Sequence, residues 1–254
     1  MNLSNPTTYP TPSRNIEATA PTGLYTFYCI PGASGSIGSA TAVEFARQGA
    51  TLALTGRDQL KLNATARRCR KAGATQQQIC VVTGDISDED DIRRIIEKTV
   101  DAFGGIDVLV NCAGIIRSGD LLTTKLSDYD AIFKTNVKGT FLVCQYARPH
   151  LLERKELGPK GVRVNSVNPG VVKDTALWTR EGAPFSQDPD TAEKIQNQLP
   201  EIYPLRRISE VKDVVNAILF LSSGKASYIH GIALPVDGGK ILTSKPGTSV
   251  PKPQ

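Results

Sequence analysis

The sequence lacks two features that would place a protein in a membrane or outside the cell. A membrane-spanning helix needs about 18 or more consecutive apolar residues, and no run of that length occurs. The five cysteines are odd in number, widely spread and without a Cys-x-x-Cys pair, which argues against a disulfide framework and a zinc site. We therefore expect a soluble protein without a metal, located in the reducing cytoplasm.

Aromatic residues and excess charge are also scarce. Phe, Trp and Tyr together make up 6% of the chain, and the net charge is +5. The sequence contains no run of Lys and Arg with interleaved aromatic residues, the pattern that favours nucleic-acid or membrane binding. We therefore expect neither a nucleic acid nor a membrane as a partner.

The two ends of the chain have no hydrophobic periodicity. Residues 1–22 are rich in Ser, Thr, Pro and Asn, and residues 243–254 are similar, which is typical of disordered tails. Arg14 is the only basic residue of the first tail, so a role in organelle targeting is not favoured. The remaining residues, 23–242, suit a single α/β domain in a chain that is 40% apolar.

Between the tails, short apolar or β-branched runs alternate with segments of helical periodicity. This alternation predicts βαβ units and a Rossmann-like, doubly wound parallel sheet. The expected strands are 25–30, 51–55, 79–83 and 106–111, and the expected helices are 37–48 and 59–71, with a third that Ser87 caps. Gly49 and Gly73 stand where left-handed helix C-caps are expected, and Asp90 stands where a capping box with Ser87 would place it.

The second half of the chain shows less regular alternation. A long helical pattern covers 127–155, with Gly139 and Pro149 as the two positions where it could be interrupted. A strand is expected almost at once afterwards, over 162–167.

A glycine-rich loop follows the first expected strand and opens the next helix. It reads Pro31-Gly-Ala-Ser-Gly-Ser-Ile-Gly38, so its glycines allow a tight turn and a close approach of backbone N–H groups to a pyrophosphate. The candidate dinucleotide-binding residues of the loop are Gly32, Ser34, Ser36, Ile37 and Gly38. A glycine-rich turn without a ligand is the alternative.

The residues after the second expected strand indicate which dinucleotide binds. An Asp or Glu about 20 residues after the loop usually binds the ribose hydroxyls of NAD(H), but this chain has Gly56 and Arg57 there. A guanidinium can form charge-assisted hydrogen bonds with a 2′-phosphate, which an acid would repel. The sequence therefore favours NADP(H) over NAD(H), the alternative being that Arg57 is only a solvated charge.

Several motifs in a fixed order resemble those of the short-chain dehydrogenase/reductases. They are the loop 32–38, Asp85 after the third strand, Asn111-Cys-Ala-Gly114 after the fourth, Asn136-Val-Lys-Gly-Thr140, Asn168-Pro-Gly170 and Val236-Asp-Gly-Gly239. Together these motifs cover roughly residues 24–242. The resemblance implies hydride transfer between NADP(H) and a carbonyl or alcohol, as in the ketone and 3-oxoacyl reductases of the family.

The resemblance also implies roles for individual residues. Asp85 would bond the adenine, Asn136 would hold a water of the proton relay, and the cofactor would be lined by Asn111, Ala113, Gly114, Pro169 and Gly170. Each role has a simpler alternative: Asp85 could only start a turn, 111–114 could be an unliganded strand end, and Asn136 could be a polar residue inside a helix.

The resemblance fails where the family keeps its catalytic residues. There a Tyr donates the proton, a nearby Lys lowers the pKa of that Tyr, and a Ser binds the carbonyl oxygen, all between the positions matched by Asn136 and Pro169. These two residues are 33 positions apart here, against roughly 70 in the family, so roughly 40 residues containing one strand and one helix are missing. The join falls near Lys155 and Glu156, and Asn136 is the only catalytic residue left.

No other tyrosine replaces the missing pair, because none has a Lys four residues later on the same helical face. Tyr203 comes nearest, with Arg207 at that spacing, but Pro204 and an expected loop make it an ordinary loop residue. We therefore expect a protein that binds NADP(H) and is catalytically impaired. The alternatives are an active NADP(H)-dependent oxidoreductase and a splice variant or gene-model product that does not fold. The family's main interface helix lies in the missing part, which leaves oligomerisation open.

Overall fold

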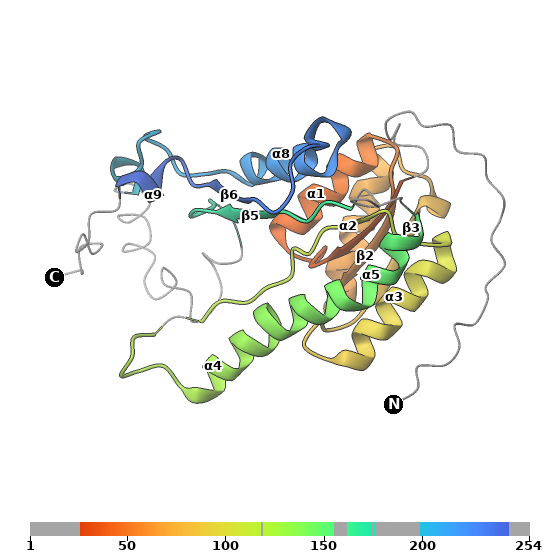
Figure 1. The fold of residues 1–254 in the computed structure, drawn as a ribbon, viewed down its shortest axis with the longest axis horizontal. Coiled ribbons are helices and arrows are strands. Elements are labelled where there is room, and N and C mark those ends of the chain that lie inside the picture. Colours follow the sequence, from red (N-terminus) through yellow and green to blue (C-terminus); the bar gives the residue numbers. More distant parts are fainter. Residues whose placement is uncertain (1–25, 118, 155–161, 174, 176–198, 244–254) are drawn as a thin grey trace.

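The computed structural model describes residues 26–117, 119–154, 162–173, 175 and 199–243 (Figure 1). The predicted tails, apart from Thr243, and the predicted join near Lys155 lie outside the described residues. Among the described helices, none is both long and apolar enough to cross a membrane.

A four-stranded parallel sheet forms the centre of the molecule, with strand order β3-β2-β1-β4. Its strands are β1 (Phe27–Pro31), β2 (Thr51–Gly56), β3 (Ile79–Thr83) and β4 (Val108–Leu109). Apolar and β-branched residues fill β1 to β3 because both faces of a parallel sheet are covered by helices. The predicted βαβ architecture is confirmed, although β4 is shorter than the expected strand 106–111.

Three helices connect these strands: α1 (Ser36–Arg47), α2 (Gln59–Lys71) and α3 (Glu89–Phe103). Gly49 and Gly73 have φ of 78° and 115°, so each glycine adopts the left-handed conformation expected after a helix. The prediction that Ser87 caps α3 is wrong, because the carboxylate of Asp88 accepts the N–H groups of Asp90 and Asp91. Both N–H groups bond the same carboxylate oxygen, Oδ1, and Asp and Ser are similarly good N-caps.

The core consists of two apolar clusters, one on each face of the sheet. Alternation along β1 sends Tyr28 and Ile30 into one cluster and Cys29 into the other. The first cluster lies under α1, α2 and α8 (Val211–Ser222), and the second lies under α3 and α5 (Thr140–Arg154). Figure 1 shows these two helical layers on either side of the strands.

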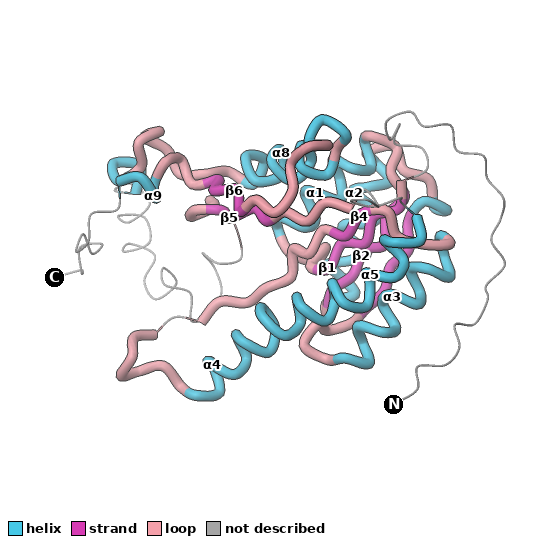
Figure 2. The backbone as a smooth tube through the Cα atoms, viewed as in Figure 1, coloured by secondary structure: helices cyan, strands magenta, loops and turns pink. Residues whose placement is uncertain are grey.

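A single helical run extends over residues 126–154, close to the predicted 127–155. It comprises α4 (Leu126–Ile132), a π-helical segment η3 (Phe133–Gly139) and α5, and it passes through Gly139 and Pro149 without ending. Gly139 is needed for packing, because a Cβ there would lie 2.5 Å from the carbonyl oxygen of Ile86. Figure 2 shows α4 projecting away from the sheet.

A second, smaller parallel sheet contains β5 (Ser166–Pro169) and β6 (Ala233–Val236). The expected strand 162–167 begins later, at Ser166. Among the described strands, β4 pairs only with β1 and β5 pairs only with β6 (Figure 2). The two sheets therefore do not form one continuous sheet. The remaining described elements are four short helices: η2 (Gln76–Gln78), η4 (Leu199–Ile202), η5 (Gly224–Ala226) and α9 (Lys240–Thr243).

Arg163 ties the small sheet to the end of α8. Its guanidinium donates to the carbonyl oxygens of Leu221 at 2.7 Å, Ser223 at 3.1 Å and Ile229 at 3.3 Å. The carbonyl groups at a helix C-terminus have no intrahelical partners, so this side chain satisfies them while it fixes the chain that leads into β5.

We predict that Arg163→Met lowers the free energy of unfolding by about 2 kcal/mol, because the carbonyls lose charge-assisted bonds while the apolar stem is kept. Urea denaturation followed by circular dichroism measures the change. Arg47→Met is the matched control, since Arg47 forms only an exposed pair with Glu44, and exposed pairs contribute little. Equal effects of the two substitutions would contradict the anchoring role.

Candidate functional site

The glycine-rich loop turns directly after β1 and is held by backbone hydrogen bonds. The N–H groups of Gly32 and Ala33 donate to the carbonyl of Thr55 at 2.9 and 3.0 Å. Gly32 has φ of 87°, and a Cβ on it would lie 2.5 Å from backbone atoms of Cys112 and Ala113. Only glycine allows the loop and the end of β4 to meet this closely.

Helix α1 starts at the end of this loop. Gly35 is its N-cap, and no side chain caps it. The N–H groups of its first residues, Ser36, Ile37 and Gly38, have no intrahelical partner and lie at the positive end of the helix dipole. A Cβ on Gly38 would collide with the carbonyl of Gly32. The loop and helix start thus form a cradle suited to a phosphate or pyrophosphate.

Two adjoining hollows open beside the loop and share Ser34 and Arg57 as lining residues. The smaller, of about 90 Å³, is lined by six of the twelve predicted cofactor residues; Ser36, Ile37, Gly38, Asn111, Pro169 and Gly170 do not line it. It is lined by Pro31, Gly32, Ser34, Gly35, Thr55, Gly56, Arg57, Gly84, Asp85, Ile86, Cys112, Ala113, Gly114, Ile115 and Thr135. The carboxyl ends of parallel strands meet at this edge, which is where open α/β sheets bind ligands.

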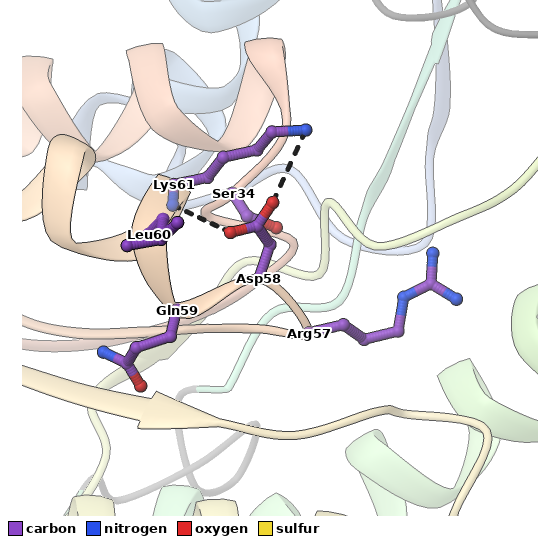
Figure 3. Close-up of a pocket in the computed structure, with 6 residues that line it drawn as sticks. All are labelled: Ser34, Arg57, Asp58, Gln59, Leu60 and Lys61. Carbon is purple, nitrogen blue, oxygen red and sulfur yellow. Dashed lines mark hydrogen bonds and ion pairs between the residues drawn. The ribbon is translucent and has the colours of Figure 1, made fainter.

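The larger hollow, of about 520 Å³, lies at the start of α2 and is lined by Ser34 and residues 57–61. Asp58 caps α2 by accepting the N–H of Lys61 at 3.0 Å, and this hydrogen bond lowers the pKa of the Asp58 carboxyl. Figure 3 shows the Lys61 amine folded toward Asp58, whereas Arg57 points away from both. The two cations therefore flank the hollow separately.

Arg57 is 57% exposed and lies 3.5 Å from Asp85. The other Asp85 oxygen accepts the N–H of Ser87 at 2.9 Å, so Asp85 does start a turn, as the simpler reading had it. Its backbone N–H donates to Asp91, and this contact is the main cause of the lowered pKa of Asp91. Two residues expected to touch the same nucleotide are thus already paired with each other.

The two predicted asparagines are both engaged with the protein itself. Asn111 donates to the Thr140 hydroxyl at 2.9 Å and accepts the N–H of Ala113 at 3.2 Å, so it fixes the end of β4 against α5. Asn136 lies in the π-helical segment, and its amide bonds both the N–H and the carbonyl of Ile115, at 2.9 and 2.8 Å. π-helical segments occur frequently at functional sites, and this one holds Ile115, in the loop after β4 that borders the smaller hollow.

Pro169 and Gly170 lie at the end of β5 and are not among the residues lining either hollow. Gly170 donates to the carbonyl of Val236 at 3.0 Å, and a Cβ on it would lie 3.0 Å from Asp237. These residues pack β5 against β6, and the structure does not bring them together with the glycine loop in one hollow.

Tyr203 is 4% exposed. Burial raises the pKa of its hydroxyl, which also accepts a hydrogen bond from the backbone of Val171. A buried tyrosine with a raised pKa is a poor proton donor at neutral pH, so the geometry agrees with the loop role inferred from the sequence. Residues 174 and 176–198, which lie between the Pro169-Gly170 motif and this loop, are outside the described part of the chain.

Several residues that line the hollows were not predicted, among them Lys61, Ile115 and Thr135. Lys61 follows Arg57 by four positions, and that spacing was a usable signal. Ile115 and Thr135 carry no signal of residue type, because they contribute by position. Within the described residues, no group of three or more His, Cys, Asp or Glu could hold a metal ion. Burial raises the pKa of the Cys112 thiol, which lines the smaller hollow, to about 12.

A glycine cradle at a helix start, at the carboxyl edge of a parallel sheet, defines a nucleotide-binding α/β protein. The family model described as short chain dehydrogenase matches residues 27–156. A second, described as enoyl-(acyl carrier protein) reductase, matches residues 154–240. The chain belongs to the short-chain dehydrogenase/reductase family, whose members are oxidoreductases that bind a nicotinamide cofactor.

Curated relatives and solved structures agree with this assignment. Glucose 1-dehydrogenase of Gluconobacter oxydans is 31% identical over 252 residues, covering 84% of this chain and 91% of the relative. A 3-oxoacyl-(acyl-carrier-protein) reductase of Thermotoga maritima is 31% identical over 242 residues, covering 84% and 96%. A family structure from Caenorhabditis elegans, solved with cofactor, has a TM-score of 0.76 and 26% identity and covers 88% of this chain and 98% of that chain.

We predict that Gly32→Ala and Gly35→Ala differ sharply in stability. Gly32→Ala forces a Cβ into backbone at a positive φ, so it should cost at least about 3 kcal/mol or prevent folding. Gly35 has φ of −90° and its added Cβ would meet only the Gly32 carbonyl at 3.3 Å, so that variant should fold. Urea denaturation compares them, and equal stabilities would show that the loop and β4 do not meet as described.

Proposed function

We propose that this protein binds NADP(H) in preference to NAD(H) and does not turn over carbonyl substrates. The observation that carries the binding proposal is the cradle itself. Its tight backbone turn requires glycine, because Cβ atoms on Gly32 and Gly38 would collide with the backbone of Cys112, Ala113 and Gly32 itself. The uncapped start of α1 points its N–H groups into the cradle. These residues fit the pyrophosphate of a dinucleotide, and Ser34 and Gly56 leave room beside it.

The preference for NADP(H) rests on the charges of the larger hollow. No acid stands at Gly56, where a Cβ would already lie 2.6 Å from the Ser34 hydroxyl oxygen. Arg57 and Lys61 line the hollow from the start of α2. Their present partners, the half-buried Asp85 at 3.5 Å and Asp58 at 3.6 Å, form only long ion pairs, so a 2′-phosphate can compete for both cations.

The proposal of lost turnover rests on a missing segment. The alignment with glucose 1-dehydrogenase is 252 positions long but contains only 84% of the 254 residues of this chain, about 213 residues. About 39 aligned positions of the relative therefore have no counterpart in this chain. The two family models also meet at 154–156, where the join was inferred. A nicotinamide cofactor supplies the hydride, but the described site contains no Tyr-x-x-x-Lys pair to supply the proton.

The surface of the long helix supports the same conclusion. Phe133, Val137 and Phe141 are four residues apart and are 47%, 56% and 63% exposed. A helix in a globular domain normally buries such an apolar stripe, so an element that would cover this one is absent from the described structure. The missing helix, which in the family contributes to the main subunit interface, accounts for this exposure. Without it, oligomerisation through that interface is not expected.

We predict that Arg57→Ala raises the dissociation constant of NADPH about 10- to 100-fold and leaves that of NADH nearly unchanged, because only NADPH carries the 2′-phosphate. Isothermal titration calorimetry measures both constants. Arg67→Ala is the matched control, since Arg67 is an exposed arginine of the same helix region that lines neither hollow. Equal loss for NADPH and NADH would contradict the role of Arg57, and absence of NADPH binding to the folded wild-type protein would contradict the function.

We also predict that the purified protein does not oxidise NADPH above the blank with ketone or 3-oxoacyl substrates. Loss of a general acid typically removes about 100- to 10,000-fold of the rate. The absorbance of NADPH is followed over time for the wild type and for Tyr203→Phe, and neither should show turnover. Turnover by the wild type that disappears in Tyr203→Phe would favour the alternative of an active oxidoreductase with a relocated acid.

A further inference from the structure

A series of largely buried hydrogen bonds connects helices α1 and α2 to the glycine loop, through side chains that line neither hollow. Thr65 of α2 donates through Oγ1 to the carbonyl of Ala33 at 2.9 Å. The Ser39 hydroxyl of α1 lies 2.8 Å from Thr65 Oγ1, and Arg68 donates to Ser39 Oγ at 2.8 Å. Ala33, Ser39 and Thr65 are 0%, 6% and 3% exposed, so this chain of bonds is largely shielded from water.

The direction of every bond in this chain is fixed by chemistry. The Ala33 carbonyl can only accept, so the single proton of Thr65 is committed to it. Ser39 must therefore donate to Thr65, and its remaining acceptor position receives the proton of Arg68, which can only donate. Three donors thus point the same way, from Arg68 to the loop, and bonds aligned in this manner strengthen one another in a low-dielectric interior.

The bond to Ala33 completes the anchoring of the loop. Ala33 N–H already donates to the carbonyl of Thr55 in β2, so Thr65 holds the other side of the same residue. Ser34 follows directly and lines both hollows, and Gly35 is the N-cap of α1. A shift of the Ala33 peptide would move Ser34 and the start of α1 together.

We propose that Thr65, Ser39 and Arg68 are positioning residues for pyrophosphate binding. They hold the Ala33 peptide so that the loop and the start of α1 keep the conformation that receives a pyrophosphate, although none of the three lines either hollow. This inference rests on the proposed function, because it takes the ligand of the cradle to be a dinucleotide.

The test compares Thr65→Val, which removes the donor but keeps the shape, with Thr65→Ser, which keeps the donor. Thr65→Val should raise the dissociation constant of NADPH about tenfold, and Thr65→Ser should stay close to the wild type. The same titrations with 2′-AMP, which has no pyrophosphate, should give equal constants for all three proteins. Thr99→Val is the matched control, because Thr99 is a buried threonine that bonds only the carbonyl of Ile95 in its own helix and the Cys29 thiol.

Equal weakening of NADPH and 2′-AMP would overturn the proposal, because it would indicate general damage to the fold. An unchanged NADPH constant in Thr65→Val would overturn it as well.

Amide hydrogen exchange in the protein without nucleotide gives a readout independent of binding: Thr65→Val should speed exchange of the peptide covering 32–38, and Thr99→Val should not. Faster loop exchange together with no NADPH binding by the wild type would reject the proposed function while supporting the anchoring, and unchanged loop exchange would reject the anchoring itself. If Thr65→Val does not fold, Ser39→Ala replaces it, because it removes the hydroxyl that links Arg68 to Thr65. Ser39→Ala should then change the NADPH dissociation constant and the loop exchange rate in the same direction, but by less.

Discussion

The contact of Gly32 with the backbone of Cys112 and Ala113 is the constraint on which the rest of the site depends. It brings the end of β1 against the end of β4 with no side chain between them. Because Gly32 must stay there, Ala33 is placed within reach of both Thr55 and Thr65, and Ser34 is turned toward Gly56. The smaller hollow is therefore formed mainly by the packing of the backbone, and the side chains that line it determine only its detailed shape.

The interruption of the sheet has a physical consequence at β4. Val110 and Cys112 donate to carbonyls of β1, so strand alternation turns the backbone groups of Asn111 away from β1. An unpaired strand edge is costly when it is buried and attracts other strands when it is exposed. The side chain of Asn111 limits this cost in part, because its amide oxygen accepts the backbone N–H of Ala113.

Features that depend on local chain geometry could be predicted from the sequence. The glycine loop, the left-handed Gly49 and Gly73 and the parallel sheet of the first four strands follow from residue type and period, and the structure confirms them. The N-cap of α3 was misassigned because Ser87 and Asp88 are both good caps, and the choice between them depends on where Asp85 starts its turn. Among the described strands β4 pairs with β1 alone, and a strand's own sequence does not reveal how many neighbours it has.

Contacts between distant segments could not be predicted at all. Asn136 was singled out by a motif, but its partner Ile115 is 21 residues away and is bonded through its backbone, so no residue type marks the pair. The same holds for Thr65 and Ala33, 32 residues apart. Such bonds form only when the helices pack against the sheet. The sequence therefore does not distinguish a threonine that makes one from any other helical threonine.

Cofactor binding and proton transfer are physically separable in this chain because different segments carry them. The residues that line the hollows all lie between Pro31 and Thr135. Helices α1 and α2 pack with α8 on one face of the sheet, and Ile86 and Ala113 of the smaller hollow belong to the cluster on the other face. The deletion proposed near residue 155 would remove neither a described strand of the first sheet nor a partner of the glycine loop. On that proposal, the lost segment would be the one between β4 and β5 that holds a substrate against the nicotinamide. Since hydride transfer needs donor and carbonyl fixed at contact distance, the same proposal separates a well-formed cradle from the ability to orient a substrate.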